Sequence, residues 1–90
     1  MYTTVRNING TSDNKPNGYD SWLDFWHFKT KSKLSFCSCD DCFSKAEVGA
    51  HVQEPGNSTS DKWYIVPLCK KCNNKTGSFK VLTNDLVPVR

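Results

Sequence analysis

The stretch Ile65-Val66-Pro67-Leu68-Cys69-Lys70-Lys71-Cys72-Asn73 decides how the chain is interpreted. It joins a short apolar run typical of a strand to a C-x-x-C pair, and a second cluster, Cys37-Ser38-Cys39-Asp40-Asp41-Cys42, lies upstream. Two groups of thiols separated by a few dozen residues can supply four tetrahedral ligands, which is how proteins hold a structural zinc ion. The sequence therefore predicts a small domain stabilised by one zinc ion per chain.

The spacing of the cysteines does not decide the identity of one of the four zinc ligands. Cys39 and Cys42 have C-x-x-C spacing, whereas Cys37 and Cys42 have C-x₄-C spacing, and zinc tolerates both. Cys69 and Cys72 form the second pair. We therefore expect Cys39, Cys42, Cys69 and Cys72 as ligands, with Cys37 competing with Cys39 and one thiol left as a spectator.

Length and composition agree with a metal-stabilised domain. The chain has 90 residues, five cysteines and a net charge of +3. A chain this short buries little surface, so a metal ion would supply stability that the core lacks. An odd number of cysteines leaves one thiol outside any disulfide set, and the N-terminus has no apolar secretion signal, so we expect a cytoplasmic protein. No stretch approaches the roughly 20 apolar residues that span a bilayer, and no membrane partner is expected.

The N-terminal part divides into a polar segment and a helix. Residues 1–18 are rich in Asn, Thr, Ser, Gly and Asp, a composition that gains little from burial, and we expect a mobile arm there. Residues 19–90 would form a single domain. Within it, Ser21 and Asp24 resemble the N-cap and acidic first turn of a helix over about residues 20–30.

Aromatic residues form a stripe along this predicted helix. Trp22, Phe25 and Trp26 share one side at i, i+3, i+4 spacing. This spacing favours rings that pack over the zinc module. The alternative is an exposed stacking surface for bases or for a partner.

A β-hairpin with a long connection is predicted over residues 47–66. Apolar side chains would occupy one face of its first strand and His51 the other, and Pro67 would end its second strand. A brief helix would follow at 69–74 and a final strand at about 79–82.

The order of these features, a cysteine knuckle, a hairpin with a histidine and a short helix with the second cysteine pair, resembles a treble-clef zinc finger. More narrowly, it resembles the HNH (His-Me finger) endonuclease family. The matching motifs are Cys39-x-x-Cys42, Ala50-His51-Val52 and Leu68-Cys69-Lys70-Lys71-Cys72-Asn73-Asn74-Lys75-Thr76, within a zinc and hairpin module of about residues 37–80. The resemblance implies an α+β, zinc-stabilised domain with a treble-clef or ββα-metal (HNH-like) core and the N-terminal aromatic helix packed on it.

The resemblance also implies catalytic roles. In the family, zinc is structural and the hairpin histidine is the general base for the water that attacks a phosphodiester. His51 would be that base, and Asn73 would be a ligand of a divalent cation such as magnesium. Two positions differ from the family pattern: Ala50 stands where many active members carry an acid, and Tyr64 aligns with their middle asparagine. These differences indicate a degenerate catalytic metal site.

Basic residues gather around the second cysteine pair, although the net charge alone is too small to indicate nucleic-acid binding. Lys70, Lys71 and Lys75 are the candidates for phosphate contacts. We therefore expect a zinc-binding, HNH-like module that binds DNA, another nucleic acid or a protein partner without catalysis. The alternative is a metal-dependent HNH endonuclease that cleaves DNA phosphodiesters with His51 as general base.

Overall fold

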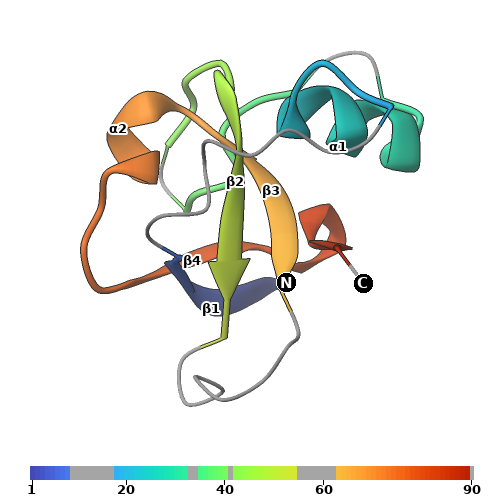
Figure 1. The fold of residues 1–90 in the computed structure, drawn as a ribbon. Helices are drawn as coiled ribbons and strands as arrows, with labels where there is room; N and C mark the ends of the chain where they lie inside the picture. The colour runs from blue at the N-terminus through green and yellow to red at the C-terminus, as the bar shows by residue number, and fades with distance from the viewer. Residues whose placement is uncertain (9–17, 33–34, 41, 55–62, 90) are drawn as a thin grey trace.

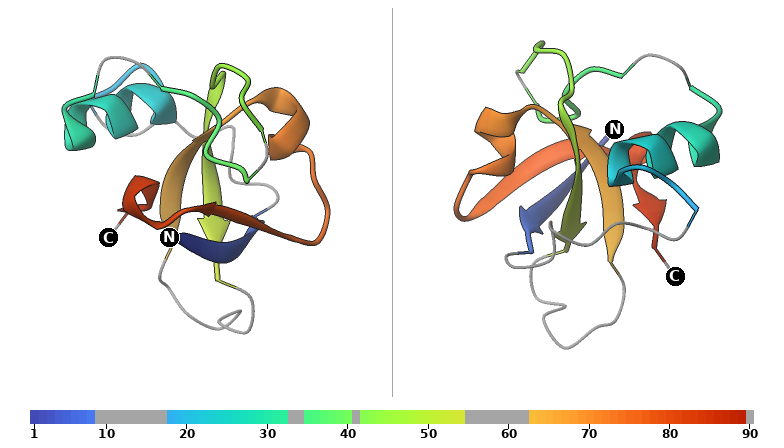
Figure 2. Two further views of the ribbon diagram at one scale, coloured as in Figure 1. Left: turned by 180° about the vertical axis from the view of Figure 1, so that it is seen from behind. Right: turned by 45° about the horizontal axis from the view of Figure 1, so that its top comes forward.

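The computed structural model describes residues 1–8, 18–32, 35–40, 42–54 and 63–89. They form an α+β fold, a five-stranded antiparallel sheet with helices, in the strand order β4-β1-β2-β3-β5 (Figures 1 and 2). None of the described helices is long and apolar enough to cross a membrane. The elements are β1 (Tyr2–Asn7), α1 (Trp22–Thr30), β2 (Val48–Gln53), β3 (Tyr64–Leu68), α2 (Lys70–Asn73), β4 (Ser78–Leu82), a 3₁₀ turn (Thr83–Asp85) and β5 (Val87–Pro88).

β1 is an inner strand of the sheet, which corrects the expectation of a mobile arm over residues 1–18. It pairs with β4 along most of its length and with β2 at its end. Val5 is fully buried opposite Phe79. Backbone pairing on both sides stabilises a strand whose side chains are mostly polar, and composition does not report such pairing. Residues 9–17 of the predicted arm lie outside the described residues.

β2 and β3 form the predicted hairpin, but Pro67 does not end it. β3 continues through Pro67 to Leu68, and Pro67 lies opposite Gly49 of β2. The carbonyl of Pro67 accepts a hydrogen bond of 2.8 Å from the N–H of Ser38, outside the hairpin. Because the nitrogen and carbonyl of one strand residue point to the same side, the nitrogen of Pro67 faces away from β2. Its missing N–H therefore removes no hydrogen bond from the hairpin.

The hairpin separates two apolar clusters, because its side chains alternate between two faces. On one face, Ala50 and Val66 pack with the cysteines and with residues of β1 and β4. On the other face, Ile65 packs against Phe25 and Trp26 of α1. The buried part of the predicted aromatic stripe thus belongs to the second cluster, and α1 covers the face of the hairpin opposite the cysteines.

Local hydrogen bonds fix both ends of α1 and attach it to the C-terminal segment. The Oγ of Ser21 accepts a hydrogen bond of 3.1 Å from the N–H of Asp24, which confirms the predicted N-cap. The helix ends at Thr30, and the next residue, Lys31, has a left-handed backbone with φ 58°. The indole N–H of Trp26 donates a hydrogen bond of 2.7 Å to the carbonyl of Asp85. The polar group of this buried ring therefore has a hydrogen-bond partner.

α1 approaches β2 so closely that Gly49 leaves no room for a side chain. A Cβ on Gly49 would lie 2.5 Å from the carbonyl carbon of Trp22 and 2.6 Å from the nitrogen of Leu23. These are backbone atoms, so relief would require the start of α1 to shift. A glycine inside a strand often marks such a close approach of another backbone.

Gly49→Ala is expected to lower the free energy of unfolding by about 3 kcal/mol, because it inserts a methyl group into a closed backbone contact. Gly77→Ala is the matched control: Gly77 has φ 87° and open space for a Cβ, so its loss should cost only about 1 kcal/mol of left-handed backbone strain. Urea unfolding of both variants measures the difference. Equal losses would contradict the close contact between α1 and β2.

Candidate metal centre

Four cysteine thiols gather on the face of the hairpin opposite α1. The sulfur atoms of Cys37, Cys42, Cys69 and Cys72 all lie within 4.8 Å of one another, and those of Cys42 and Cys69 are 3.8 Å apart. A tetrahedral ion with metal–sulfur distances of about 2.3 Å requires sulfurs about 3.8 Å apart. All five cysteines of the chain are free thiols. The four thiols are therefore positioned to bind one metal ion.

The first two thiols come from a tight turn that we call the knuckle (residues 35–40 and 42–46). The N–H of Cys37 donates a hydrogen bond of 2.8 Å to the carbonyl of Ser44, and the N–H of Cys42 donates one of 3.2 Å to the carbonyl of Cys39. These bonds bend the chain back on itself. As a result, Cys37 and Cys42 present their sulfurs to the same site.

The other two thiols come from the start of α2. Cys69 is the N-cap residue and Cys72 lies three residues later, so both side chains face the same side of the helix. A carboxylate oxygen of Glu47 accepts a hydrogen bond of 2.9 Å from the N–H of Lys70. This bond satisfies an amide that a helix start leaves without an intrahelical partner, and it attaches α2 to the residue before β2.

The end of α2 is held by the first strand of the chain. The side-chain amide of Asn7 donates hydrogen bonds of 3.3, 3.1 and 3.2 Å to the carbonyls of Cys72, Asn73 and Lys75. Carbonyls at a helix end need such donors. β1 therefore supports the segment that carries Cys72, although it is far from the cysteines in sequence.

Cys39 is not part of the four-thiol group, although C-x-x-C spacing makes it the first candidate. Its sulfur accepts a hydrogen bond of 3.2 Å from the ammonium of Lys75, and this bond raises the pKa of Lys75. Its backbone N–H forms a hydrogen bond with the sulfur of Cys37. Of the two alternatives that the spacing leaves open, the structure brings Cys37 to the site through the C-x₄-C pair with Cys42.

Cys37, Cys42 and Cys72 differ in how easily they ionise. Hydrogen bonding to the backbone N–H of Ser44 is the main effect that lowers the pKa of Cys42 to about 6. Burial raises the pKa of Cys37 and of Cys72. Because metals bind thiolates, Cys42 is better prepared to bind a metal than Cys37 and Cys72, which must release their protons as the metal binds.

His51 lies among aromatic rings on the α1 face of β2. The centroid of its ring is 4.5 Å from that of Trp22 and 6.3 Å from that of Trp63, and the residue is only 6% exposed. Its Nδ1 is buried and has no hydrogen-bond partner among the described residues. Burial lowers the pKa of His51, so the ring is neutral at physiological pH.

The structure does not bring Asn73 and His51 together. Asn73 follows Cys72, which packs on the face of the hairpin opposite His51. Asn73 instead borders a polar cavity of about 250 Å³ beside Arg6 and Lys75, and His51 does not line that cavity. The sequence motif implies that His51, as general base, lies beside Asn73, as metal ligand. The described contacts do not place these two residues side by side.

The predicted phosphate-contacting lysines lie in α2, at Lys70 and Lys71, and just after it, at Lys75. Lys70 and Lys71 are exposed, whereas the ammonium of Lys75 is directed toward the knuckle. Arg6 of β1 and Lys80 of β4 are exposed on the outward face of their strand pair. Sequence reasoning missed Arg6 because it assigned that residue to an arm. Val5 is an apolar residue between polar ones, and this alternation could have predicted a strand with Arg6 on its exposed face.

Cys37→Ser is expected to abolish metal binding, because the C-x₄-C pair then supplies one thiolate instead of two. Cys39→Ser removes a cysteine two positions away and should retain about one metal ion per chain. Elemental analysis of the two purified variants measures this difference. The reverse outcome, with metal kept in Cys37→Ser and lost in Cys39→Ser, would show that the ligand assignment is wrong.

Acidification should destabilise the protein through His51. Because the pKa of His51 is lower in the folded than in the unfolded chain, the unfolded chain binds more protons as pH falls below about 6.5. The stabilising effect of the neutral ring is complete above that pH and declines below it, by up to about 1.4 kcal/mol per pH unit. His51→Leu should therefore show a shallower loss of thermal stability between about pH 7 and 5. Thiol protonation affects both proteins alike, so parallel curves would contradict a buried neutral His51.

Comparison of the chain with protein-family models, with curated proteins and with solved structures gives no match in any of the three. The geometry of the thiol group and its surroundings is therefore the basis for the functional argument.

Proposed function

We propose that this protein is a zinc-stabilised, non-catalytic domain of the treble-clef type that binds nucleic acid through the basic surface around α2. The observation that carries the proposal is the group of four cysteine sulfurs within 4.8 Å of one another. Two come from a knuckle and two from the first turn of a helix, and the β2–β3 hairpin lies between them in sequence. This order supports a treble-clef arrangement, and four thiolates with tetrahedral spacing suit zinc.

A structural role for the metal follows from the ligand count. Four protein thiolates complete a tetrahedral shell, whereas catalytic zinc sites keep one position open for water or substrate. The metal also joins the knuckle to α2, two segments that bury few apolar residues besides their cysteines. In a domain of 90 residues, the binding free energy of such an ion, roughly 10 kcal/mol or more, is a large part of the folding free energy.

The environment of His51 favours the non-catalytic alternative over the HNH endonuclease. A general base must reach its substrate water within hydrogen-bond distance. The ring of His51 is packed against Trp22 and is almost fully buried. These features suit a side chain that fills the interface between β2 and α1.

The basic surface supports phosphate contacts. Lys70 and Lys71 are exposed at the start of α2, and Arg6 and Lys80 are exposed on the adjacent strand pair. The nearby carboxylate of Glu47 is already hydrogen-bonded to the N–H of Lys70. Lysine and arginine on one surface provide the sequence-independent, salt-dependent part of nucleic-acid binding.

Zinc-loaded protein should bind a short fluorescent DNA duplex with an affinity that falls steeply as salt rises. Replacing both Lys70 and Lys71 by Gln should lower the affinity and reduce the log-log salt slope by up to about 2, one unit for each lost phosphate contact. The matched control replaces Lys29 and Lys31 of α1 by Gln, which removes the same charge from another surface. Fluorescence anisotropy at several salt concentrations measures both slopes.

Two results would contradict this proposal. Absent or salt-independent DNA binding would remove the nucleic-acid part while leaving the zinc domain in place. Nicking of plasmid DNA in the presence of magnesium, manganese or nickel, lost in His51→Ala, would replace the non-catalytic proposal with the endonuclease.

A further inference from the structure

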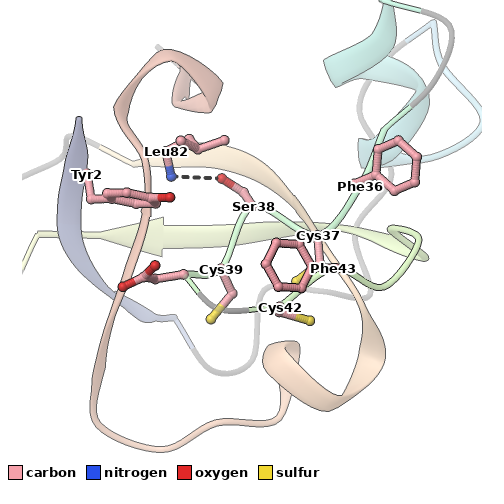
Figure 3. A pocket seen from close by; sticks show the side chains of 9 residues that line it. Tyr2, Phe36, Cys37, Ser38, Cys39, Cys42, Phe43 and Leu82 are labelled. Atoms are coloured by element: carbon pink, nitrogen blue, oxygen red, sulfur yellow. Dashed lines mark hydrogen bonds between the residues drawn. The ribbon is translucent and has the colours of Figure 1, made fainter.

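An apolar groove of about 450 Å³ lies on the outer side of the knuckle (Figure 3). One wall comes from Phe36 and Phe43, which flank the knuckle cysteines, and the other from Tyr2 of β1 and Leu82 of β4. The described residues that line it are Tyr2, Phe36, Cys37, Ser38, Cys39, Asp40, Cys42, Phe43 and Leu82. None of the exposed lysines of α2 is a lining residue.

The apolar walls of this groove are unusually open to solvent. Phe43 is 90% exposed, Phe36 64%, Tyr2 49% and Leu82 40%. Single exposed apolar side chains are ordinary, but four large ones around one depression form the kind of surface that marks an interaction site. Covering them would remove apolar surface from water, which is the main driving force for association.

Backbone hydrogen bonds hold the groove in shape before any partner arrives. Ser38, only 2% exposed, forms its floor and accepts hydrogen bonds from the N–H of Leu82 at 3.0 Å to its Oγ and 3.2 Å to its carbonyl. The N–H of Asp40 donates a bond of 2.8 Å to the carbonyl of Lys80. Tyr2 and Leu82 are cross-strand partners. A preformed site avoids the cost of ordering its walls when a ligand binds.

The charge of the groove distinguishes between classes of occupant. Asp40 is an acidic lining residue, and no described lysine or arginine lines the groove. Lys45, paired with Phe36, is exposed but is not a lining residue. With zinc bound, four thiolates would give the site that includes the wall residues Cys37 and Cys42 a charge of about −2, and the ammonium of Lys75, hydrogen-bonded to Cys39, would offset about one unit of it. Lys80 neighbours Leu82 on β4 but is not a lining residue. Phosphates are disfavoured beside such a wall, and a cationic partner is favoured.

We propose that the groove binds a segment of a protein partner in which a large apolar side chain is flanked by lysine or arginine. The apolar side chain lies between Phe43 and Leu82, and the basic side chain pairs with Asp40. The inference rests on the proposed zinc site only because the metal holds the wall that contains Cys37 and Cys42. It does not depend on whether the basic surface around α2 binds nucleic acid.

The test uses zinc-loaded full-length protein and a displayed library of short random peptides. We expect enrichment of peptides that combine Phe, Leu, Ile, Met or Trp with an adjacent Lys or Arg. For a synthesised consensus peptide, Phe43→Ser should weaken binding at least about tenfold and Asp40→Asn about threefold. Phe28→Ser is the matched control, because Phe28 is another exposed phenylalanine, located on α1, and its loss should leave the affinity unchanged.

The zinc content of each variant shows that the fold is retained, so failure of this inference is separable from failure of the zinc proposal. Absence of enrichment by zinc-loaded protein would overturn the inference. Enrichment of acidic peptides, equal binding by Phe43→Ser, or displacement of the peptide by single-stranded oligothymidylate would do so as well. Concentration-dependent dimerisation that Phe43→Ser abolishes would assign the groove to a second copy of this chain and likewise overturn it.

Discussion

The convergence of four cysteine sulfurs is the constraint on which the rest of the structure depends. Cys37 and Cys42 belong to the knuckle, and Cys69 and Cys72 begin α2. The large apolar side chains of the knuckle, Phe36 and Phe43, are exposed, and Cys72 is the buried residue of α2. A metal ion held by the four sulfurs would cross-link the two segments and fix the knuckle against β4 and α2 against the hairpin, as a structural ion does in small domains.

The first strand, β1, connects the four-thiol site to the rest of the sheet. Asn7 at the end of β1 binds three carbonyls at the end of α2, and Val5 is buried in the same apolar cluster as Cys72. Residues near the start of the chain therefore support the last two thiols. The same strand contributes Tyr2 to the apolar groove and Arg6 to the polar cavity beside Asn73, so β1 connects two sites with different chemistry.

The two faces of the β2–β3 hairpin have different roles because side chains alternate along a strand. Ala50 packs toward the thiols, and His51, the next residue, points toward α1 and lies against Trp22. A histidine in that position is separated from the helix that carries the second cysteine pair. The order of elements along the chain is still similar to that of the HNH pattern. His51, however, is packed against other side chains and is almost inaccessible to solvent.

By itself, the sequence determined the features that depend on neighbours along the chain. The spacing of the cysteines indicated a metal site, alternation identified the hairpin and the orientation of His51, and Ser21 predicted the start of α1. Only the tertiary structure brought Cys37, and not Cys39, into the group of four thiols, placed β1 inside the sheet and buried His51. Each of these depends on contacts between distant segments: the knuckle with β3 and β4, Asn7 with α2, and Gly49 with Trp22. Residue spacing carries no information about such contacts, because they arise only when the chain has folded.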